Sequence, residues 1–161
     1  MKTILILLLL IVFVSLQISL APIISIKDIT PQLIFIFVFF ASFTLGQTSG
    51  IWVGFFSGFL CDIFDVTHFG LNMGLLLIAG FVIGTMKPKF YRDNLLVDIL
   101  FFAVALFLYE TIYLILLWQF SLGIFLLNIL RYSIPTVLYT TIISLFVFTL
   151  LKRIPYFVQS H

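Results

Sequence analysis

The sequence has very few charged residues, and this scarcity excludes an ordinary soluble domain. Only 9% of its 161 residues are Asp, Glu, Lys or Arg, whereas soluble domains carry roughly 25%. Hydrophobic residues make up 63% of the chain, and its mean hydropathy is +1.33. These values are typical of an integral membrane protein, and they leave no segment long enough for a soluble catalytic domain. We therefore expect residues 1–161 to form a single transmembrane domain.

The residues that carry enzyme chemistry are equally scarce. The chain has one cysteine and two histidines, and no spacing pairs a nucleophile with a base. The glycine fingerprints that bind nucleotide phosphates are absent, and a net charge of +2 is too small to suggest nucleic acid. Asp62, Asp65 and His68 form a small cluster that capping and headgroup contacts explain better than a metal ion does. We expect no enzyme activity, cofactor or metal.

Long apolar runs are what the sequence has in abundance, and short polar segments separate them. The runs predict six helices, of which the first five lie at about residues 4–20, 33–46, 50–64, 69–86 and 95–118, and the sixth ends at Leu151. Residues 124–130 either form an interfacial helix or extend the sixth helix. The first run resembles a signal peptide, but it is long enough to cross the hydrocarbon core. Pro22 also follows directly after the candidate cleavage site, so we expect this helix to be retained.

The basic residues are distributed unevenly among the predicted loops. Six crossings place both termini on one side of the membrane. With a cytoplasmic N-terminus, the basic residues inside are Lys2, Lys87, Lys89, Arg92, Lys152 and Arg153. Lys27 and Arg131 then lie outside or near the outer face. Because this bias follows the positive-inside rule, we predict that both termini are cytoplasmic.

We expect the fold to be organised around a glycine-rich stretch in residues 50–70. Four residues in it are spaced four apart: Gly50, Gly54, Gly58 and Asp62. Four residues nearly complete one helical turn, so they share one face. Small residues on a face let another helix backbone approach closely in lipid. Gly80 and Gly84 form a similar pair in the next predicted helix. The facing helix belongs either to this chain, which we favour, or to a partner.

Three ionisable residues are predicted to lie within the membrane: Asp62, Glu110 and Arg131. Such residues are costly in lipid and indicate function by default. Glu110 and Arg131 lie about 12 Å and about 10 Å from the same outer face, counted along their predicted helices. One interpretation is a buried ion pair. In the other, Arg131 reaches the headgroups and Glu110 is protonated. Asp62 lies near the same level and is a second candidate partner for Arg131.

The stretch from Gly50 to Gly84 resembles the MreD family of bacterial rod shape-determining proteins. In that family, a helix with the pattern G-x-x-x-G-x-x-x-D is followed by a short turn and then Phe-Gly or Leu-Gly. Here these positions are Gly54, Gly58, Asp62, Phe69 and Gly70. One departure is His68, where the family often has proline. The length, helix count and basic tail extend the likeness over nearly the whole chain.

This resemblance implies an all-α integral membrane protein with about six transmembrane helices, similar to the substrate-binding subunits of energy-coupling-factor transporters. It implies a non-enzymatic scaffold of the cell-elongation machinery in the bacterial inner membrane. The implied partners are an MreC-like bitopic protein and, indirectly, MreB filaments, the RodA glycosyltransferase and a penicillin-binding transpeptidase. The surrounding membrane lipid is also an expected partner.

The alternative function is a small-solute-binding membrane subunit of a transporter. Such a subunit should enclose a polar pocket that opens outward. A scaffold should instead fill its interior with side chains and present an apolar groove.

Overall fold

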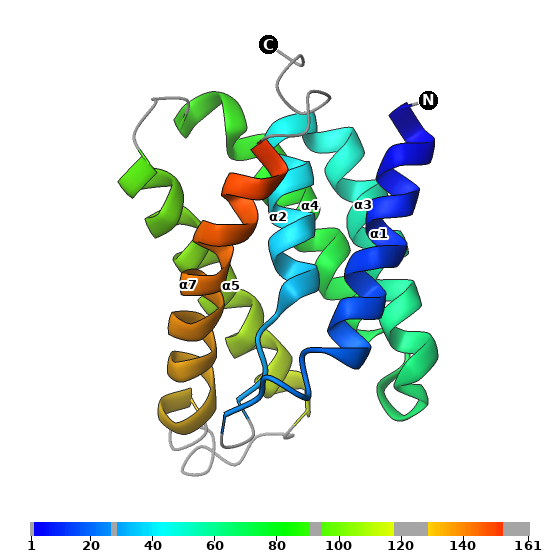
Figure 1. The fold of residues 1–161 in the computed structure, drawn as a ribbon, viewed down its shortest axis with the longest axis vertical. Coiled ribbons are helices and arrows are strands. Elements are labelled where there is room, and N and C mark those ends of the chain that lie inside the picture. The colour runs from blue at the N-terminus through cyan, green and yellow to red at the C-terminus, as the bar shows by residue number, and fades with distance from the viewer. Residues whose placement is uncertain (1, 27–28, 91–94, 118–128, 153–161) are drawn as a thin grey trace.

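The computed structural model of residues 1–161 describes residues 2–26, 29–90, 95–117 and 129–152 (Figure 1). Within them lie the α-helices α1 (Lys2–Ser19), α2 (Leu33–Leu45), α3 (Gln47–Phe64), α4 (Leu71–Phe90), α5 (Leu95–Leu117) and α7 (Ile134–Lys152). A short 3-10 helix, η1 (Val66–His68), joins α3 to α4, and a π-helical turn, η2 (Ile129–Ser133), leads into α7. The part of the chain described here contains no β-sheet, which confirms the all-α prediction.

The six helices run alternately along the long axis of the molecule (Figure 1). In that view α1, α3 and α5 descend, whereas α2, α4 and α7 ascend. The start of α1 and the end of α7 therefore lie at the same end of the bundle.

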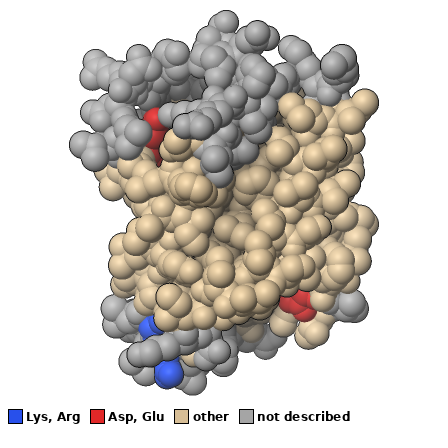
Figure 2. All heavy atoms as spheres, in the orientation of Figure 1, with Lys and Arg blue, Asp and Glu red and all other residues tan. Residues whose placement is uncertain are grey.

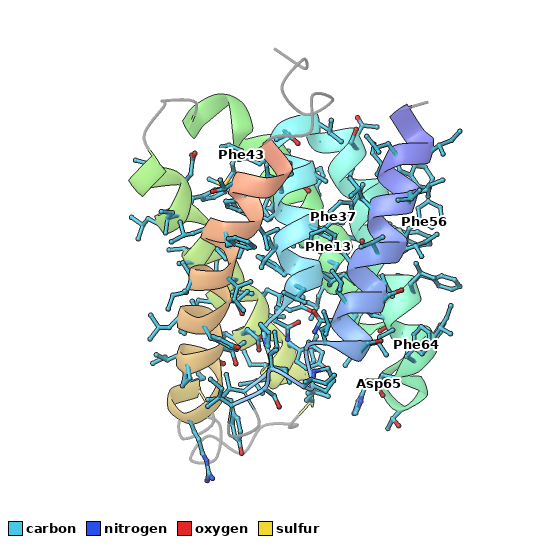
Figure 3. The ribbon with its side chains drawn as sticks, in the orientation of Figure 1. Phe13, Phe37, Phe43, Phe56, Phe64 and Asp65 are labelled. Atoms are coloured by element: carbon cyan, nitrogen blue, oxygen red, sulfur yellow. The ribbon has the colours of Figure 1, made fainter. Side chains whose placement is uncertain are left out.

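Helix α2 is the core of this bundle. All ten residues from Leu33 to Ser42 are buried, because α1, α3, α4 and α7 surround the helix. A helix that is apolar on every side must be enclosed in this way. Its phenylalanines contact rings from three neighbouring helices: Phe13–Phe37 and Phe39–Phe148 are stacked, and Phe39–Phe102 is edge-to-face. Figure 3 shows Phe13 and Phe37 facing each other between α1 and α2.

The outer surface of the bundle is apolar over most of its height. Figure 2 shows one face on which the coloured acidic and basic atoms lie near the two ends and the middle is uncharged. Two described segments, Val97–Leu117 and Arg131–Thr149, are long and apolar enough to cross a membrane. Three shorter helical segments are also apolar: Ile4–Ser19, Leu33–Leu45 and Leu71–Met86. These features agree with an α-helical membrane protein, and the count of six crossings stays a prediction.

The predicted helix boundaries need correction at two glycines. Residues 47–49, which we expected to form a polar turn, are instead the first turn of α3. The chain reverses at Gly46, whose φ of +90° is readily adopted only without a side chain. Helix α4 begins at Leu71 rather than residue 69, because Gly70 also has a left-handed φ of +96°.

Two other predictions concern the end of α4 and the segment before α7. Helix α4 continues to Phe90, into the stretch 87–94 that we expected to be polar loop. The predicted segment 124–130 lies outside the described residues except for its last two positions, which belong to η2.

Candidate functional site

Helices α3 and α4 contact each other through their backbones. A Cβ atom built on Gly50 would lie 2.5 Å from the carbonyl oxygen of Gly80. A Cβ built on Gly58 would lie 2.5 Å from the carbonyl oxygen of Asn72. Both distances are too short for any real contact, so the backbone of α4 occupies the space in which α3 side chains would lie.

The same close approach extends along both helices. A Cβ on Gly54 would collide with the carbonyl group of Leu76. A Cβ on Gly84, at the other end of α4, would lie 2.5 Å from the Cα of Gln47. The five glycines that the sequence singled out for helix packing thus belong to one contact between α3 and α4 of this chain. We call this contact the glycine seam; its members are Gly50, Gly54, Gly58, Gly80 and Gly84.

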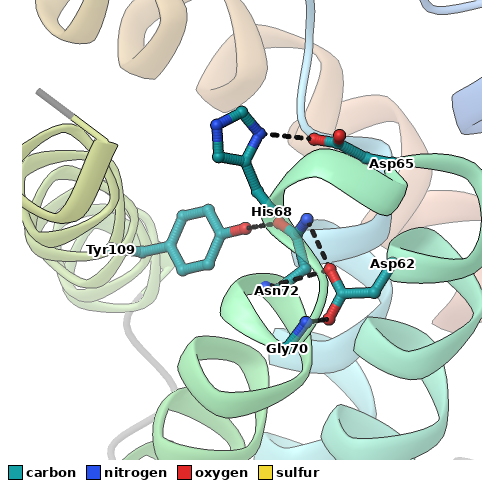
Figure 4. A network of polar contacts seen from close by, with 6 residues as sticks. All are labelled: Asp62, Asp65, His68, Gly70, Asn72 and Tyr109. Carbon is teal, nitrogen blue, oxygen red and sulfur yellow. Dashed lines mark hydrogen bonds and ion pairs between the residues drawn. The ribbon is translucent and has the colours of Figure 1, made fainter.

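Asp62 ends the glycine seam and caps the next helix. Its side chain is fully buried. One carboxylate oxygen, Oδ2, accepts hydrogen bonds of 2.9 Å from the backbone N–H groups of Gly70 and Met73. The other, Oδ1, accepts from the backbone N–H of Asn72 at 3.2 Å and from its side-chain amide at 2.9 Å (Figure 4).

The position of Asp62 explains why a carboxylate is stable in this apolar bundle. The first N–H groups of α4 have no acceptors within their own helix. The carboxylate of Asp62, on α3, accepts their hydrogen bonds. Its negative charge also faces the positive end of the α4 dipole. Asp62 is therefore a capping residue, and the structure does not place it against Arg131, the basic partner we considered.

Tyr109 connects α5 to this cap, and the sequence analysis did not identify it. Its hydroxyl donates a 3.0 Å hydrogen bond to the side-chain oxygen of Asn72 (Figure 4). Asn72 therefore donates to Asp62 and accepts from Tyr109, which fixes the orientation of its amide. No local pattern predicts this link, because the residues that it joins are 37 positions apart.

The structure does not bring Glu110 and Arg131 together. Glu110 is 7% exposed, its Oε1 has no hydrogen-bond partner among the described residues, and the side chain of Gln32 lies beside it. Arg131 is exposed, with its guanidinium 5.7 Å from the ring centre of Tyr132. The depth estimate assumed that Arg131 lies well inside a helix. It lies instead in η2, before the first residue of α7.

The predicted cluster of Asp62, Asp65 and His68 separates into two parts. Asp65 Oδ2 contacts His68 Nδ1 at 3.2 Å, and both side chains are about 40% exposed. Asp62 directs its oxygens into α4 instead (Figure 4). Within the described ranges, no three His, Cys, Asp or Glu residues gather so as to hold a metal ion. At the motif turn, the Phe69 ring is exposed and packs edge-on against Phe59 at 6.2 Å.

A second feature lies on the other side of α4. An apolar groove of about 490 Å³ runs between α4 and α5. Its lining extends from Leu75 to Met86 on α4 and from Val97 to Ile112 on α5. We call it the α4–α5 groove.

Comparison with known proteins identifies one family. The sequence model described as rod shape-determining protein MreD matches residues 1–154 of the 161-residue chain. The matched region includes the glycine seam and the Asp62 cap. No curated protein and no solved structure matches the chain. The similarity to energy-coupling-factor transporter subunits therefore stays a prediction.

Proposed function

Since the chain belongs to the MreD family of rod shape-determining membrane proteins, we propose that it is a non-enzymatic scaffold of the cell-elongation machinery. In this role it binds an MreC-like bitopic protein in the inner membrane. Together with MreB filaments, the two proteins help to position the RodA glycosyltransferase and its penicillin-binding transpeptidase for peptidoglycan synthesis.

The observation that carries this proposal is the filled interior of the bundle. The centre is occupied by the fully or almost fully buried rings of Phe35, Phe39 and Phe102. A solute-binding subunit needs space and polar groups at that place. A packed interior with apolar outer faces instead supports a rigid body that works through its surface.

One observation favours the alternative, a solute-binding subunit of a transporter. Glu110 retains an unpartnered carboxylate oxygen in a buried position. Two groups beside it are already paired with other residues, however. The backbone N–H of Gln32 donates to Thr140, and Tyr109 donates to Asn72. These two pairs reduce the number of groups beside Glu110 that could recognise a solute, so we favour the scaffold.

The scaffold proposal is tested by its partners and by cell shape. A tagged copy purified from native membranes should carry the MreC-like protein, and an unrelated multi-pass protein with the same tag should not. Depleting the chain should make rod-shaped cells round. Cells that stay rod-shaped after depletion, with no MreC-like protein in the purified fraction, would contradict the proposal.

We further propose six crossings with both termini in the cytoplasm. The alternating direction of the helices supports this topology (Figure 1), as does the distribution of basic residues. In a Cys61→Ser background, single cysteines at Lys89 and in the C-terminal tail should react with a membrane-impermeant reagent only after the cytoplasmic side is opened. Labelling of the two positions from opposite sides would exclude this topology.

A further inference from the structure

The α4–α5 groove has an apolar lining and room for a small ligand. Its volume of about 490 Å³ falls within the ~300–1,000 Å³ range of small-molecule sites. Its walls include the side chains of Val82, Leu100 and Val104, which are 43%, 66% and 50% exposed. In a membrane, such a lining selects a hydrocarbon chain, because it offers almost nothing for a polar group to bind.

The length of the groove is compatible with one acyl chain of a single leaflet. At 1.5 Å per residue, the lining extends about 16 Å on α4, from Leu75 to Met86, and about 22 Å on α5, from Val97 to Ile112. The hydrocarbon core of a bilayer is ~30 Å thick, so one leaflet accounts for ~15 Å. Both walls are therefore closer in length to one leaflet than to the whole core.

The stretch of α4 that follows the groove lining has two lysines in its sequence. The lining on α4 ends at Met86, and the last turn of the same helix contains Lys87 and Lys89. Asp98 is the acidic residue in the first turn of α5, so the two lysines exceed the negative charge of these two helix ends. Basic sites between transmembrane helices are where anionic lipid headgroups bind.

We propose that the α4–α5 groove binds one acyl chain of an anionic phospholipid, whose phosphate lies at the end of α4 that carries Lys87 and Lys89. The lipid fills the space that the groove leaves between these two helices, so it stabilises the association of α5 with α4. Binding to the folded state alone raises the temperature of unfolding. This inference is independent of the scaffold function.

The groove itself is tested with bulky side chains. Delipidated protein is titrated with phosphatidylglycerol, and bound lipid is counted by native mass spectrometry. Val82→Trp and Val104→Trp place a large ring in the groove and should weaken binding on the order of tenfold. Val12→Trp is the matched control, because Val12 is 42% exposed on α1, away from the groove. All three variants should unfold near the wild-type temperature when lipid is absent.

The headgroup is tested with phosphatidylcholine of the same acyl composition. Wild-type protein should prefer phosphatidylglycerol, and Lys87→Gln with Lys89→Gln should reduce that preference on the order of tenfold. Lys2→Gln, at the same end of the bundle on α1, should leave it unchanged. Equal binding of phosphatidylglycerol to Val82→Trp and the wild type would overturn the proposal. So would a Val82→Trp protein that keeps its lipid but loses a second copy or a partner.

Discussion

On the side that faces α3, helix α4 touches its neighbour through backbone atoms, whereas on the side that faces α5 a groove of about 490 Å³ lies between the helices. The first side has glycine at intervals, and the second has branched and long apolar side chains. Lipid tails are as apolar as leucine, so burial alone does not hold helices together in a membrane. Close packing does, and α4 achieves it against α3 but not along the groove that it forms with α5.

This comparison divides the bundle into two parts that should respond differently to substitution. The glycine seam and its Asp62 cap allow almost no change in volume or charge. The helices α5 and α7 are joined to the rest through aromatic side chains around α2. Side chains adjust to a substitution more readily than backbones do.

Enlarging a glycine of the seam should have the largest effect. Gly54→Leu places its Cβ against the carbonyl group of Leu76, so α3 and α4 must separate. Overpacking typically costs ~1–3 kcal/mol and occasionally more, and we expect at least about 3 kcal/mol here because backbone must move. Thermal unfolding in detergent measures the loss.

The matched control for this substitution lies on the same helix pair. Gly74→Leu should be neutral or slightly stabilising, since no atom lies within 4 Å of a Cβ at Gly74 and leucine is the better helix former. Equal losses of stability in Gly54→Leu and Gly74→Leu would contradict the claim that the glycine seam requires residues without side chains.

Removing the cap should have the next largest effect. Asp62→Ala leaves buried N–H groups of Gly70, Asn72 and Met73 without acceptors. Each unsatisfied group costs ~1–3 kcal/mol before relaxation, and we expect a net loss of about 3 kcal/mol. Asp65→Ala, three residues further on, should cost less than about 0.5 kcal/mol because its side chain is 42% exposed. Comparable losses in the two variants would contradict the capping role.

The link from the cap to α5 should contribute less. Tyr109→Phe removes a hydrogen bond to Asn72 while keeping the ring, and it should lower the free energy of unfolding by about 1 kcal/mol. Tyr113→Phe serves as the control, since Tyr113 stacks on Tyr109 without donating a hydrogen bond in the described structure. A loss confined to Tyr113→Phe would argue against the Asn72 contact.

The smallest effect is expected where the sequence suggested an ion pair. Glu110→Gln and Arg131→Gln should change stability independently, because the buried Glu110 and the exposed Arg131 do not meet. Their effects should add within about 0.5 kcal/mol in a double-mutant cycle. A coupling energy above about 1 kcal/mol would show that the two charges interact after all.

Much of the helical framework was predictable from local patterns. Apolar runs predicted the helices α1, α2 and α5 to within about two residues at each end. The starts of α3 and α4 were wrong because Gly46 and Gly70 set them through backbone conformation, and α4 also continues four residues past its predicted end. Glycine is compatible with both a turn and a helix, so the sequence could not say which glycines would have a positive φ.

The candidate site was predictable in its parts and not in its connections. The four-residue spacing showed that Gly50, Gly54 and Gly58 share a face. Asp62 was recognised as costly and functional, with capping, headgroup contact or pairing with Arg131 as its expected roles, but the sequence did not say which helix it caps. Its true donors begin eight residues later, across the turn between α3 and α4. A capping interaction between two helices leaves no periodic signal in either of them.

By itself, the sequence determined the membrane class, the family motif and the glycine face, because composition and helical periodicity are properties of local segments. Only the tertiary structure decided that α4 fills that face, that Asp62 caps α4, and that Glu110 and Arg131 stay apart. Those outcomes depend on how the turns direct each helix against the others. Short turns at Gly46 and Gly70 set that path, and they bring together residues that no local pattern relates.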